Sequence, residues 1–354
     1  MRSVHHRSSC RLPPNYRLMR PLVTTGWTEP MLIPMLAFGA GLVVLIWSAD
    51  RFVAAAAALS LRLGVSSLAV GLTVVALGTS APEVLVSGSA AWQGSLGVAL
   101  GNAQGSNIAN IGLVLGLVLI LAAQPAMPGL AGRQSIALLL AMAALGVALY
   151  DLHLQRPEAG LLLFGLLVFL AGTAHQARRD RRLARELQQT AVGELTATGS
   201  PWRLSAVLVF TLVLLLAGAQ LLVWGAVSTA RQLGLNELVI GATIVALGTS
   251  LPELATAISS TLKRHHGMTL GNLLGSNVFN IFAVIGVAGM IGPGPLDAAV
   301  WQRDYVFLLL TGGLLLLLIA VYSRRRQPIP RIYALPLLAL YGLYLLLNYR
   351  ALIA

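Results

Sequence analysis

The sequence has one cysteine, Cys10, and only 10% of its 354 residues are charged. A single cysteine excludes an intrachain disulfide and a cysteine-based metal centre. A soluble domain usually carries about 25% charged residues, so the low charge argues against a soluble protein. Hydrophobic residues make up 57% of the chain, and the mean hydropathy is +0.80. Most of the chain is therefore expected to lie in lipid.

Ten apolar stretches are long enough to cross a bilayer, because a spanning helix needs roughly 20 apolar residues. The sequence therefore predicts an all-α polytopic membrane protein with about ten transmembrane helices, embedded in the lipid bilayer. The stretches lie near 32–57, 66–90, 96–122, 135–153, 158–176, 204–231, 237–261, 269–291, 304–322 and 332–349.

Lysine is almost absent, since 23 of the 24 cationic residues are arginine, and the formal net charge is +12. A basic balance can indicate nucleic-acid binding. Here the arginines collect in the loops, where positive charge sets membrane orientation, so no nucleic-acid partner is predicted. The run HQARRDRRLARE at 175–186 places the linker 177–200 in the cytoplasm, and alternation then places both termini outside. The oligomeric state stays open, and a monomer is compatible with the sequence.

The N-terminal segment 1–30 breaks this charge pattern, because it carries five arginines on the side predicted to be outside. It lacks the apolar core of a signal peptide. Two interpretations stay open: the segment 1–30 is a disordered extension, or the natural start is Met31. In both interpretations this segment lies outside the fold.

Two stretches of the chain recur later in the sequence, both at the same offset. Residues 71–90 match 241–260 at 11 of 20 positions, and residues 100–117 match 270–287 at ten of 18. Chance apolar similarity would not keep glycine, threonine, serine, proline, glutamate and asparagine in register. The sequence therefore predicts two homologous halves.

The predicted halves are 31–176 and 201–354, joined by the linker 177–200. Each half holds five predicted spans, and an odd number inverts the second half relative to the first. Inverted repeats are typical of secondary transporters, whose substrate sites lie near the midplane between the halves.

A glutamate recurs in the middle of two apolar spans, within GTSAPE at 78–83 and GTSLPE at 248–253. A carboxylate at the bilayer centre costs several kcal/mol unless it has a partner or water. The second, third, seventh and eighth predicted spans carry no lysine or arginine in their central parts. A bound metal cation is therefore the expected partner of Glu83 and Glu253, and a protonated structural acid is the alternative.

A proline precedes each of these glutamates. Pro82 and Pro252 lack an N–H group and clash with the preceding turn. They are expected to release the carbonyls of 76–79 and 246–249, which membrane proteins tolerate where such groups line a cavity. A packing kink is the alternative. The hydroxyl groups beside these carbonyls belong to Thr79, Ser80, Thr249 and Ser250.

The second repeated motif is GNAQGSNIAN in the first half and GNLLGSNVFN in the second. On a helix, Ser106 and Asn110 share a face, as do Ser276 and Asn280, because they are four residues apart. These four are predicted ligands, and Asn102 and Asn272 lie one turn earlier on the same stripe. The G-x-x-x-G spacings, Asn107 and Asn277 are predicted to serve helix packing.

All these groups offer oxygen: carboxylate, amide, hydroxyl and backbone carbonyl. Oxygen-only sites suit hard cations such as calcium. The absence of histidine and cysteine in the repeated motifs makes zinc or copper a poor fit. Two carboxylates balance one calcium ion or two sodium ions, and a site that cannot hold both loads at once is a physical basis for antiport. No cofactor is predicted.

In these two motifs the sequence resembles the sodium/calcium exchanger (cation/calcium antiporter) superfamily, and the bacterial calcium/sodium antiporter branch most closely. The resemblance implies a bacterial inner (plasma) membrane location. It also implies ion sites between the halves, with ligands from Ala76, Thr79, Ser80, Glu83, Ser106 and Asn110, and from Ala246, Thr249, Ser250, Glu253, Ser276 and Asn280.

The resemblance further implies that the first and sixth helices move across a rigid core. Asp50 and Arg51, in the first of these helices, are expected to form an ion pair at an interface. Some relatives carry aspartate at the position of Asn280, which leaves the sodium stoichiometry and any potassium dependence open.

The function predicted is exchange of sodium for calcium by alternating access. The alternative is a calcium/proton antiporter or an exchanger of another divalent cation. A remote alternative is an intramembrane hydrolase, which needs a base beside a serine. No intramembrane histidine or lysine is available for that role, so the chain is not expected to be an enzyme.

Overall fold

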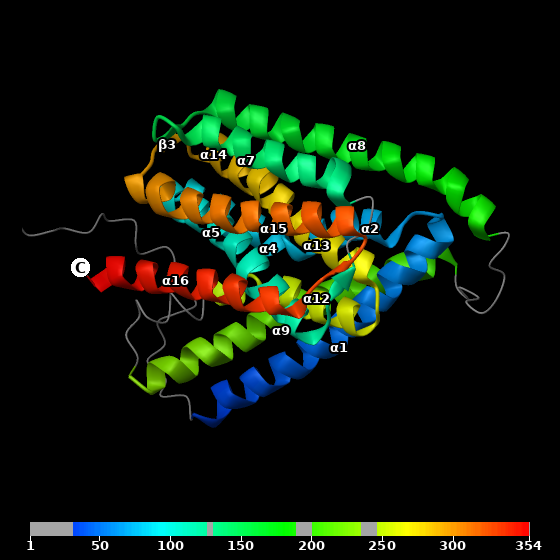
Figure 1. Ribbon diagram of the computed structural model, residues 1–354. Coiled ribbons are helices and arrows are strands. Elements are labelled where there is room, and N and C mark those ends of the chain that lie inside the picture. The colour runs from blue at the N-terminus through cyan, green and yellow to red at the C-terminus, as the bar shows by residue number, and fades with distance from the viewer. Residues whose placement is uncertain (1–30, 126–129, 189–199, 235–245, 354) are drawn as a thin grey trace, which may run out of the picture.

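The structure is a computed structural model of the chain, and it describes residues 31–125, 130–188, 200–234 and 246–353. Nearly all of these residues are helical, as Figure 1 shows. The prediction of an all-α polytopic membrane protein is confirmed. The N-terminal segment 1–30, expected to be an extension, lies outside the described residues.

The first half contains eight α-helices and three π-helical segments within its described residues. The α-helices are α1 (Leu32–Leu63), α2 (Ser67–Val70), α3 (Ala76–Thr79), α4 (Ala81–Trp92), α5 (Leu96–Ala109), α6 (Gly116–Leu121), α7 (Ser135–Leu149) and α8 (Arg156–Gln188). The π-helical segments are Gly71–Val75, Asn110–Leu115 and Leu130–Gln134.

The second half follows the same order. Its described α-helices are α9 (Pro201–Gln232), α11 (Ala246–Gly248), α12 (Leu251–Leu262), α13 (His266–Phe279), α14 (Gly286–Ile291), α15 (Val306–Arg325) and α16 (Ala334–Ile353). The π-helical segments are Asn280–Ile285 and Val300–Tyr305, and Arg331–Tyr333 is a 3₁₀ turn. The bounds of α12, α13 and α14 equal those of α4, α5 and α6 shifted by 170 residues, which is also the offset of the sequence repeat.

Within the described residues, eight helices are long and apolar enough to cross a membrane, and one further span is broken. The broken span joins Ser67–Thr79 to Ala81–Trp92 with a bend of 43°. The predicted span 237–261 lies partly outside the described residues. The fifth span was predicted to end near 176, whereas α8 continues as a helix to Gln188. The first part of the predicted linker is therefore helical.

The two spans that carry GNAQGSNIAN and GNLLGSNVFN, called the GSN motifs below, form the centre of the bundle. In an apolar 18-residue stretch of Leu96–Leu121 and of His266–Ile291, 72% and 83% of the residues are buried, against 28% in the corresponding stretches of α1 and α9. The central spans are buried because other helices surround them, whereas a smaller share of α1 and α9 is covered by neighbouring helices. The repeated motifs therefore lie in the protein interior.

Helices α1 and α9 pack against each other along one flank of the bundle, at an angle to the other helices (Figure 1). Glycine permits the close approach: a Cβ atom on Gly41 would lie 2.5 Å from the backbone nitrogen of Leu222, and one on Gly225 would lie 2.5 Å from that of Phe38. Small residues let membrane helices meet backbone to backbone. The two long helices thus form a pair beside the bundle.

Four two-residue strands connect the halves at the ends of the bundle. Strand β1 (Gln124–Pro125) pairs with β4 (Pro328–Ile329), and β2 (His153–Leu154) pairs with β3 (Gly294–Pro295), both antiparallel. Each pair takes one strand from each half. The halves are therefore held together by backbone hydrogen bonds outside the spans as well as by helix packing.

Candidate functional site

The break between α3 and α4 puts Glu83 at a helix start. Helix α3 ends at Thr79 and α4 begins at Ala81, so Pro82 lies in the first turn of α4, where a missing N–H group is tolerated. Glu83 follows in the same turn. The N-terminus of a helix carries partial positive charge and favours a carboxylate.

The second half repeats this arrangement. Helix α12 begins at Leu251, and Pro252 and Glu253 lie in its first turn. Two helix starts, one from each half, therefore present a carboxyl group inside the membrane-spanning bundle.

Both glutamates are fully buried, with 0% of each residue exposed. One oxygen of each has a hydroxyl partner: Ser106 Oγ donates to Glu83 Oε1 at 3.5 Å, and Ser80 Oγ donates to Glu253 Oε1 at 3.0 Å. The other oxygen, Oε2, has no hydrogen-bond partner in either glutamate among the described residues. A buried carboxylate oxygen without a donor is destabilising unless something else binds it.

Contacts cross between the halves at this point. Ser80 belongs to the first half and reaches Glu253 in the second. Ser106 in the first half also lies 3.5 Å from the Thr249 hydroxyl in the second. The two motif sets, far apart in the sequence, are thus brought into one cluster, as the repeats predicted.

Two asparagine side chains in the cluster are unpartnered within the part of the chain that the structure describes. Asn110 and Asn280 are buried, and neither the Oδ1 nor the Nδ2 atom of either one is hydrogen-bonded there. Each is the first residue of a π-helical segment. π-helical segments are rare in proteins, and many of those that occur lie at functional sites. A fully unsatisfied buried amide calls for a bound ion or water, so both fit a ligand role.

Asn272 forms hydrogen bonds with two of the predicted ligand residues and with Thr256. Its Oδ1 accepts from the hydroxyls of Thr79 at 3.3 Å and Ser276 at 3.5 Å. Its Nδ2 donates to the Thr256 hydroxyl at 3.2 Å. The sequence placed Asn272 on the right stripe of its helix, but its position between Thr79 and Ser276 depends on the tertiary fold and gave no sequence signal. Thr256 was missed for the same reason.

The backbone at Ala76 differs from the sequence expectation. Its carbonyl was expected to be released by Pro82, but it accepts the Ser80 N–H at 3.0 Å and also contacts the Thr79 hydroxyl at 3.4 Å. The reason is that α3 ends before the proline, so Pro82 interrupts no ladder at that carbonyl. In the second half the Ser250 N–H instead donates to the Leu247 carbonyl at 3.1 Å. The side chain of Ala246 and the residues just before it lie outside the described part of the chain.

The packing role is confirmed for the second-half glycines and for Asn107, whereas a Cβ atom on Gly101 would meet nothing within 4 Å, and Asn277 Nδ2 donates to Leu273 in its own helix. A Cβ atom on Gly271 would lie 2.6 Å from the Leu68 carbonyl oxygen, and one on Gly275 would lie 2.7 Å from that of Leu72. Asn107 Nδ2 donates to the Asn277 carbonyl at 3.2 Å, which joins the two central spans. These contacts confirm the predicted role of the glycine spacing in α13 and of Asn107.

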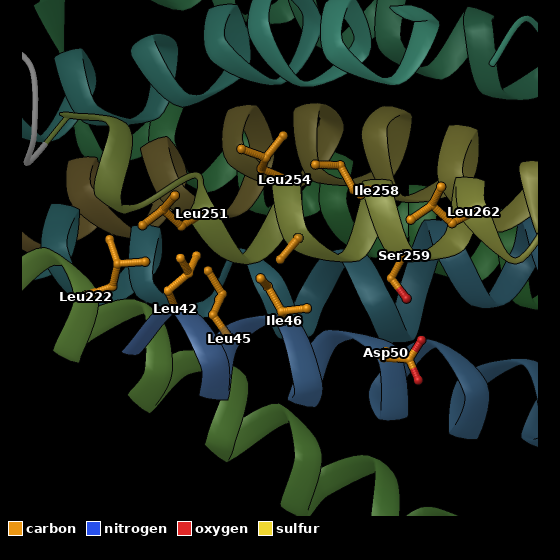
Figure 2. A pocket seen from close by; sticks show the side chains of 11 residues that line it. Leu42, Leu45, Ile46, Asp50, Leu222, Leu251, Leu254, Ile258, Ser259 and Leu262 are labelled. Atoms are coloured by element: carbon orange, nitrogen blue, oxygen red, sulfur yellow. The ribbon is translucent and has the colours of Figure 1, made fainter. Parts of the chain in front are cut away.

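The expected ion pair between Asp50 and Arg51 is wrong. Asp50 pairs instead with Lys263, at 2.8 Å, and the Arg51 guanidinium lies 5.8 Å from the centre of the Trp47 ring. Figure 2 shows the Asp50 carboxylate near Ser259 at one end of an apolar cavity of about 350 Å³ between α1 and α12. The pair therefore ties the flanking helix α1 to the end of a helix that carries a motif glutamate.

The site as a whole offers oxygen atoms of several kinds around two carboxylates. Within the described residues, no group of three or more histidine, cysteine, aspartate or glutamate side chains is placed to hold a metal ion. A cation at this site would therefore bind hydroxyl and amide oxygens as well as the two carboxylates. A site with two carboxylates, hydroxyls and amides suits hard cations with high coordination numbers and does not suit zinc or copper.

Comparison with known proteins gives a consistent result. The sequence profile of a family described as sodium/calcium exchanger protein matches residues 33–174 and 204–350. The putative antiporter CaxA of Alkalimonas amylolytica is 44% identical over 302 residues, which cover 84% of this chain and 93% of CaxA. The inner membrane protein YrbG of Escherichia coli is 35% identical over 301 residues, which cover 85% of this chain and 91% of YrbG.

A relative named as a sodium/calcium exchanger, MaX1 of Methanosarcina acetivorans, is 30% identical over 285 residues, which cover 72% of this chain and 81% of MaX1. Among solved structures, the sodium-calcium exchanger NCX_Mj soaked without sodium and calcium matches with a TM-score of 0.75 and 29% identity. The match covers 88% of this chain and 97% of NCX_Mj.

Proposed function

The chain belongs to the sodium/calcium exchanger family and is a membrane antiporter, and from that premise we propose that it exchanges sodium for calcium at the cluster around Glu83 and Glu253. One observation supports the assignment of the site. Among the described residues, each of these buried carboxyl groups has one oxygen without a partner, and the amides of Asn110 and Asn280 are wholly unpartnered.

The proposed ligands come equally from both halves. Glu83 and Glu253 supply charge, and the remaining ligands supply neutral oxygen. These are the side chains of Thr79, Ser80, Ser106, Asn110, Thr249, Ser250, Ser276 and Asn280, with the backbone carbonyls of Ala76 and Ala246. The Ala76 carbonyl already accepts one N–H, so it would bind an ion through its second lone pair.

Charge explains why the two ions exchange. One calcium ion or two sodium ions neutralise two carboxylates. One calcium with two sodium ions would leave an excess of two positive charges in a water-poor interior, and an uncompensated buried charge costs several kcal/mol. Binding of one load therefore expels the other, and this competition couples the two fluxes.

Alternating access would follow from the arrangement of α1 and α9. They are joined by glycine contacts and are less buried than the central spans, which hold the GSN motifs. A pair that slides beside a fixed core would open the site first to one side of the membrane and then to the other, with the ions held near the midplane.

Orientation follows from charge. We place the segment 177–200 in the cytoplasm because of its arginine run, and both chain ends on the opposite side. The relative YrbG is named as an inner membrane protein. A bacterial inner membrane location for this chain is consistent with that name.

The test is radioactive calcium flux in proteoliposomes, with a sodium gradient and a proton gradient imposed in separate experiments. A sodium gradient should drive calcium uptake against its own gradient, and a proton gradient of equal size should not. Uptake driven by protons alone would assign a calcium/proton antiporter instead. Equal transport of manganese or magnesium would assign an exchanger of another divalent cation.

A further inference from the structure

A cavity of about 690 Å³ links the proposed ion site to one end of the bundle. Ser106 and Thr249 line it at the site, and Asp297, Arg303 and Asp304 line it elsewhere. Asp297 is exposed, whereas Ser106 is buried, so the cavity runs from the surface to the site. Ions that reach the site from this end pass the three charged residues.

The inner two of these residues form an ion pair. Arg303 Nε and Nη2 donate to the two carboxylate oxygens of Asp304 at 2.8 and 3.2 Å. The Asp304 side chain is only 3% exposed. Asp297 is held separately, because its Oδ1 accepts the Ala299 N–H at 2.7 Å. Two carboxylates and one guanidinium leave a net charge of −1 on the cavity wall.

The equivalent position in the first half carries an amide in place of this carboxylate. Arg303 and Asp304 lie near the end of a π-helical segment whose counterpart in the first half, Leu130–Gln134, has Arg133 and Gln134 at the same positions. Gln134 is buried as well and donates to Gln176 at 3.3 Å. An amide therefore fits the equivalent place in the other half, and of these two equivalent positions only Asp304 carries an acid.

We propose that Asp304 and Asp297 attract cations into this cavity and so set the apparent affinity for ions arriving from this side, with Arg303 limiting the strength of that attraction. The inference rests on the proposed function, because it assumes that calcium and sodium bind at Glu83 and Glu253. A cleft lined by one sign of charge raises association rates by roughly 10- to 1,000-fold in the strongest cases, and the effect falls with ionic strength. A net charge of −1 lies at the weak end of that range.

The test compares the two membrane sides in proteoliposomes of known orientation. The apparent KM for calcium is measured from each side, at low and high concentrations of an inert salt. Asp304→Asn and Asp297→Asn should each raise KM about three- to tenfold on the cavity side and leave the other side unchanged. Both should also flatten the dependence of KM on salt. Arg303→Gln should act in the opposite direction and lower KM on the cavity side.

Asp151→Asn is the matched control. Asp151 is exposed and lies just before β2, and the partner strand β3 lies just before Asp297. The variant therefore removes a carboxylate from the same end of the molecule, and Asp151 does not line the cavity. This variant should leave KM unchanged on both sides. If Asp304→Asn does not insert, the exposed Asp297 carries the test alone.

The outcomes separate the two proposals. Wild-type protein without sodium-driven calcium flux would overturn the proposed function and this inference with it. Normal flux with an unchanged KM in Asp297→Asn and Asp304→Asn, or an equal change on both sides, would overturn the entry role alone. Changes of the same sign in Asp304→Asn and Arg303→Gln would assign the pair a purely structural role.

Discussion

The hydroxyl of Ser80, in the first half of the chain, donates a 3.0 Å hydrogen bond to Oε1 of Glu253, in the second half. The two residues are 173 positions apart in sequence. A carboxyl group from one half is thus oriented by a hydroxyl from the other. In the proposed site the ligands come from both halves, so we expect substitutions in either half to affect the same binding event.

The two glutamates provide the most direct test. Glu83→Gln and Glu253→Gln keep the shape of the side chain and remove one charge, so a calcium ion is no longer balanced. We expect each to reduce sodium-driven calcium exchange by at least about 100-fold, which corresponds to roughly 2.7 kcal/mol. Flux in proteoliposomes measures the effect. Glu158→Gln is the control, because Glu158 also lies in the first turn of a helix but outside the cluster. Wild-type flux in either site variant, at normal expression, would make these acids structural.

The bond from Ser80 should matter for calcium affinity. A hydrogen bond to a charged group contributes about 1.5 to 3 kcal/mol, so Ser80→Ala should weaken apparent calcium affinity roughly 10- to 100-fold. The control is Ser60→Ala, since Ser60 is also buried but donates to the Ala57 carbonyl in its own helix, away from the cluster. Calcium titration of transport decides the question, and similar affinities for the two variants would rule out a role for Ser80 in binding.

Asn280 tests the charge count. Asn280→Asp adds a third carboxylate to the cluster, which changes the cation load that gives neutrality. We expect altered sodium dependence, or a pH dependence that wild type lacks, with membrane insertion maintained. Asn110→Asp is the equivalent change in the first half and should behave similarly. Flux measured against sodium concentration at several pH values reports the change, and curves that overlay wild type in both variants would remove these asparagines from the ligand set.

The ion pair between Asp50 and Lys263 links α1 to the end of α12 at 2.8 Å. The pair is partly exposed, so we expect a contribution of at most about 1 kcal/mol, or roughly fivefold in the balance between two states of the transporter. Asp50→Asn should change the maximal exchange rate by that factor, and the exchanged pair Asp50→Lys with Lys263→Asp should restore it. Arg51→Gln is the control. A double variant no better than the single ones would show that the pair does not link the two helices functionally.

Orientation is tested by cysteine labelling in a Cys10→Ser background. Gln188→Cys, at the end of α8, should react with an impermeant maleimide only after the membrane is opened. Gln93→Cys, in the exposed turn after α4, should react in intact cells, because the predicted topology places that turn outside. The reverse pattern of labelling would invert the proposed orientation.

The sequence was sufficient for the features that depend on composition and repetition. Apolar length identified eight unbroken spans and one broken span among the described residues, while the predicted span 237–261 lies partly outside them. The repeated acids pointed to the cluster, because a duplicated glutamate in apolar surroundings has few explanations other than function. Glu83 and Glu253 are buried in the structure, with neighbours from the opposite half, as the repeat suggested.

Other features depend on geometry that the sequence does not encode locally. Asp50 was assigned to its neighbour Arg51, yet adjacent residues on a helix do not face each other, and the true partner, Lys263, is brought close only by tertiary packing. The π-helical segments that begin at Asn110 and Asn280 form hydrogen bonds one residue further along the chain than an α-helix does, and no residue pattern predicted them. The Ala76 carbonyl was misjudged because the helix ends at Thr79, before the proline can interrupt it.

The pairing of β1 with β4 has a consequence for biosynthesis. Gln124 is paired with Ile329, which leaves the ribosome much later because most of the chain lies between the two residues. At a synthesis rate of roughly 5 to 20 residues per second, the first strand waits about 10 to 40 s for its partner. Throughout that interval β1 lacks its partner strand, and until residue 253 has been made Glu83 also lacks its counterpart. Partly folded chains with exposed apolar surface and unpaired strand edges are the species on which chaperones act, so we expect the chain to need such protection until its second half is made.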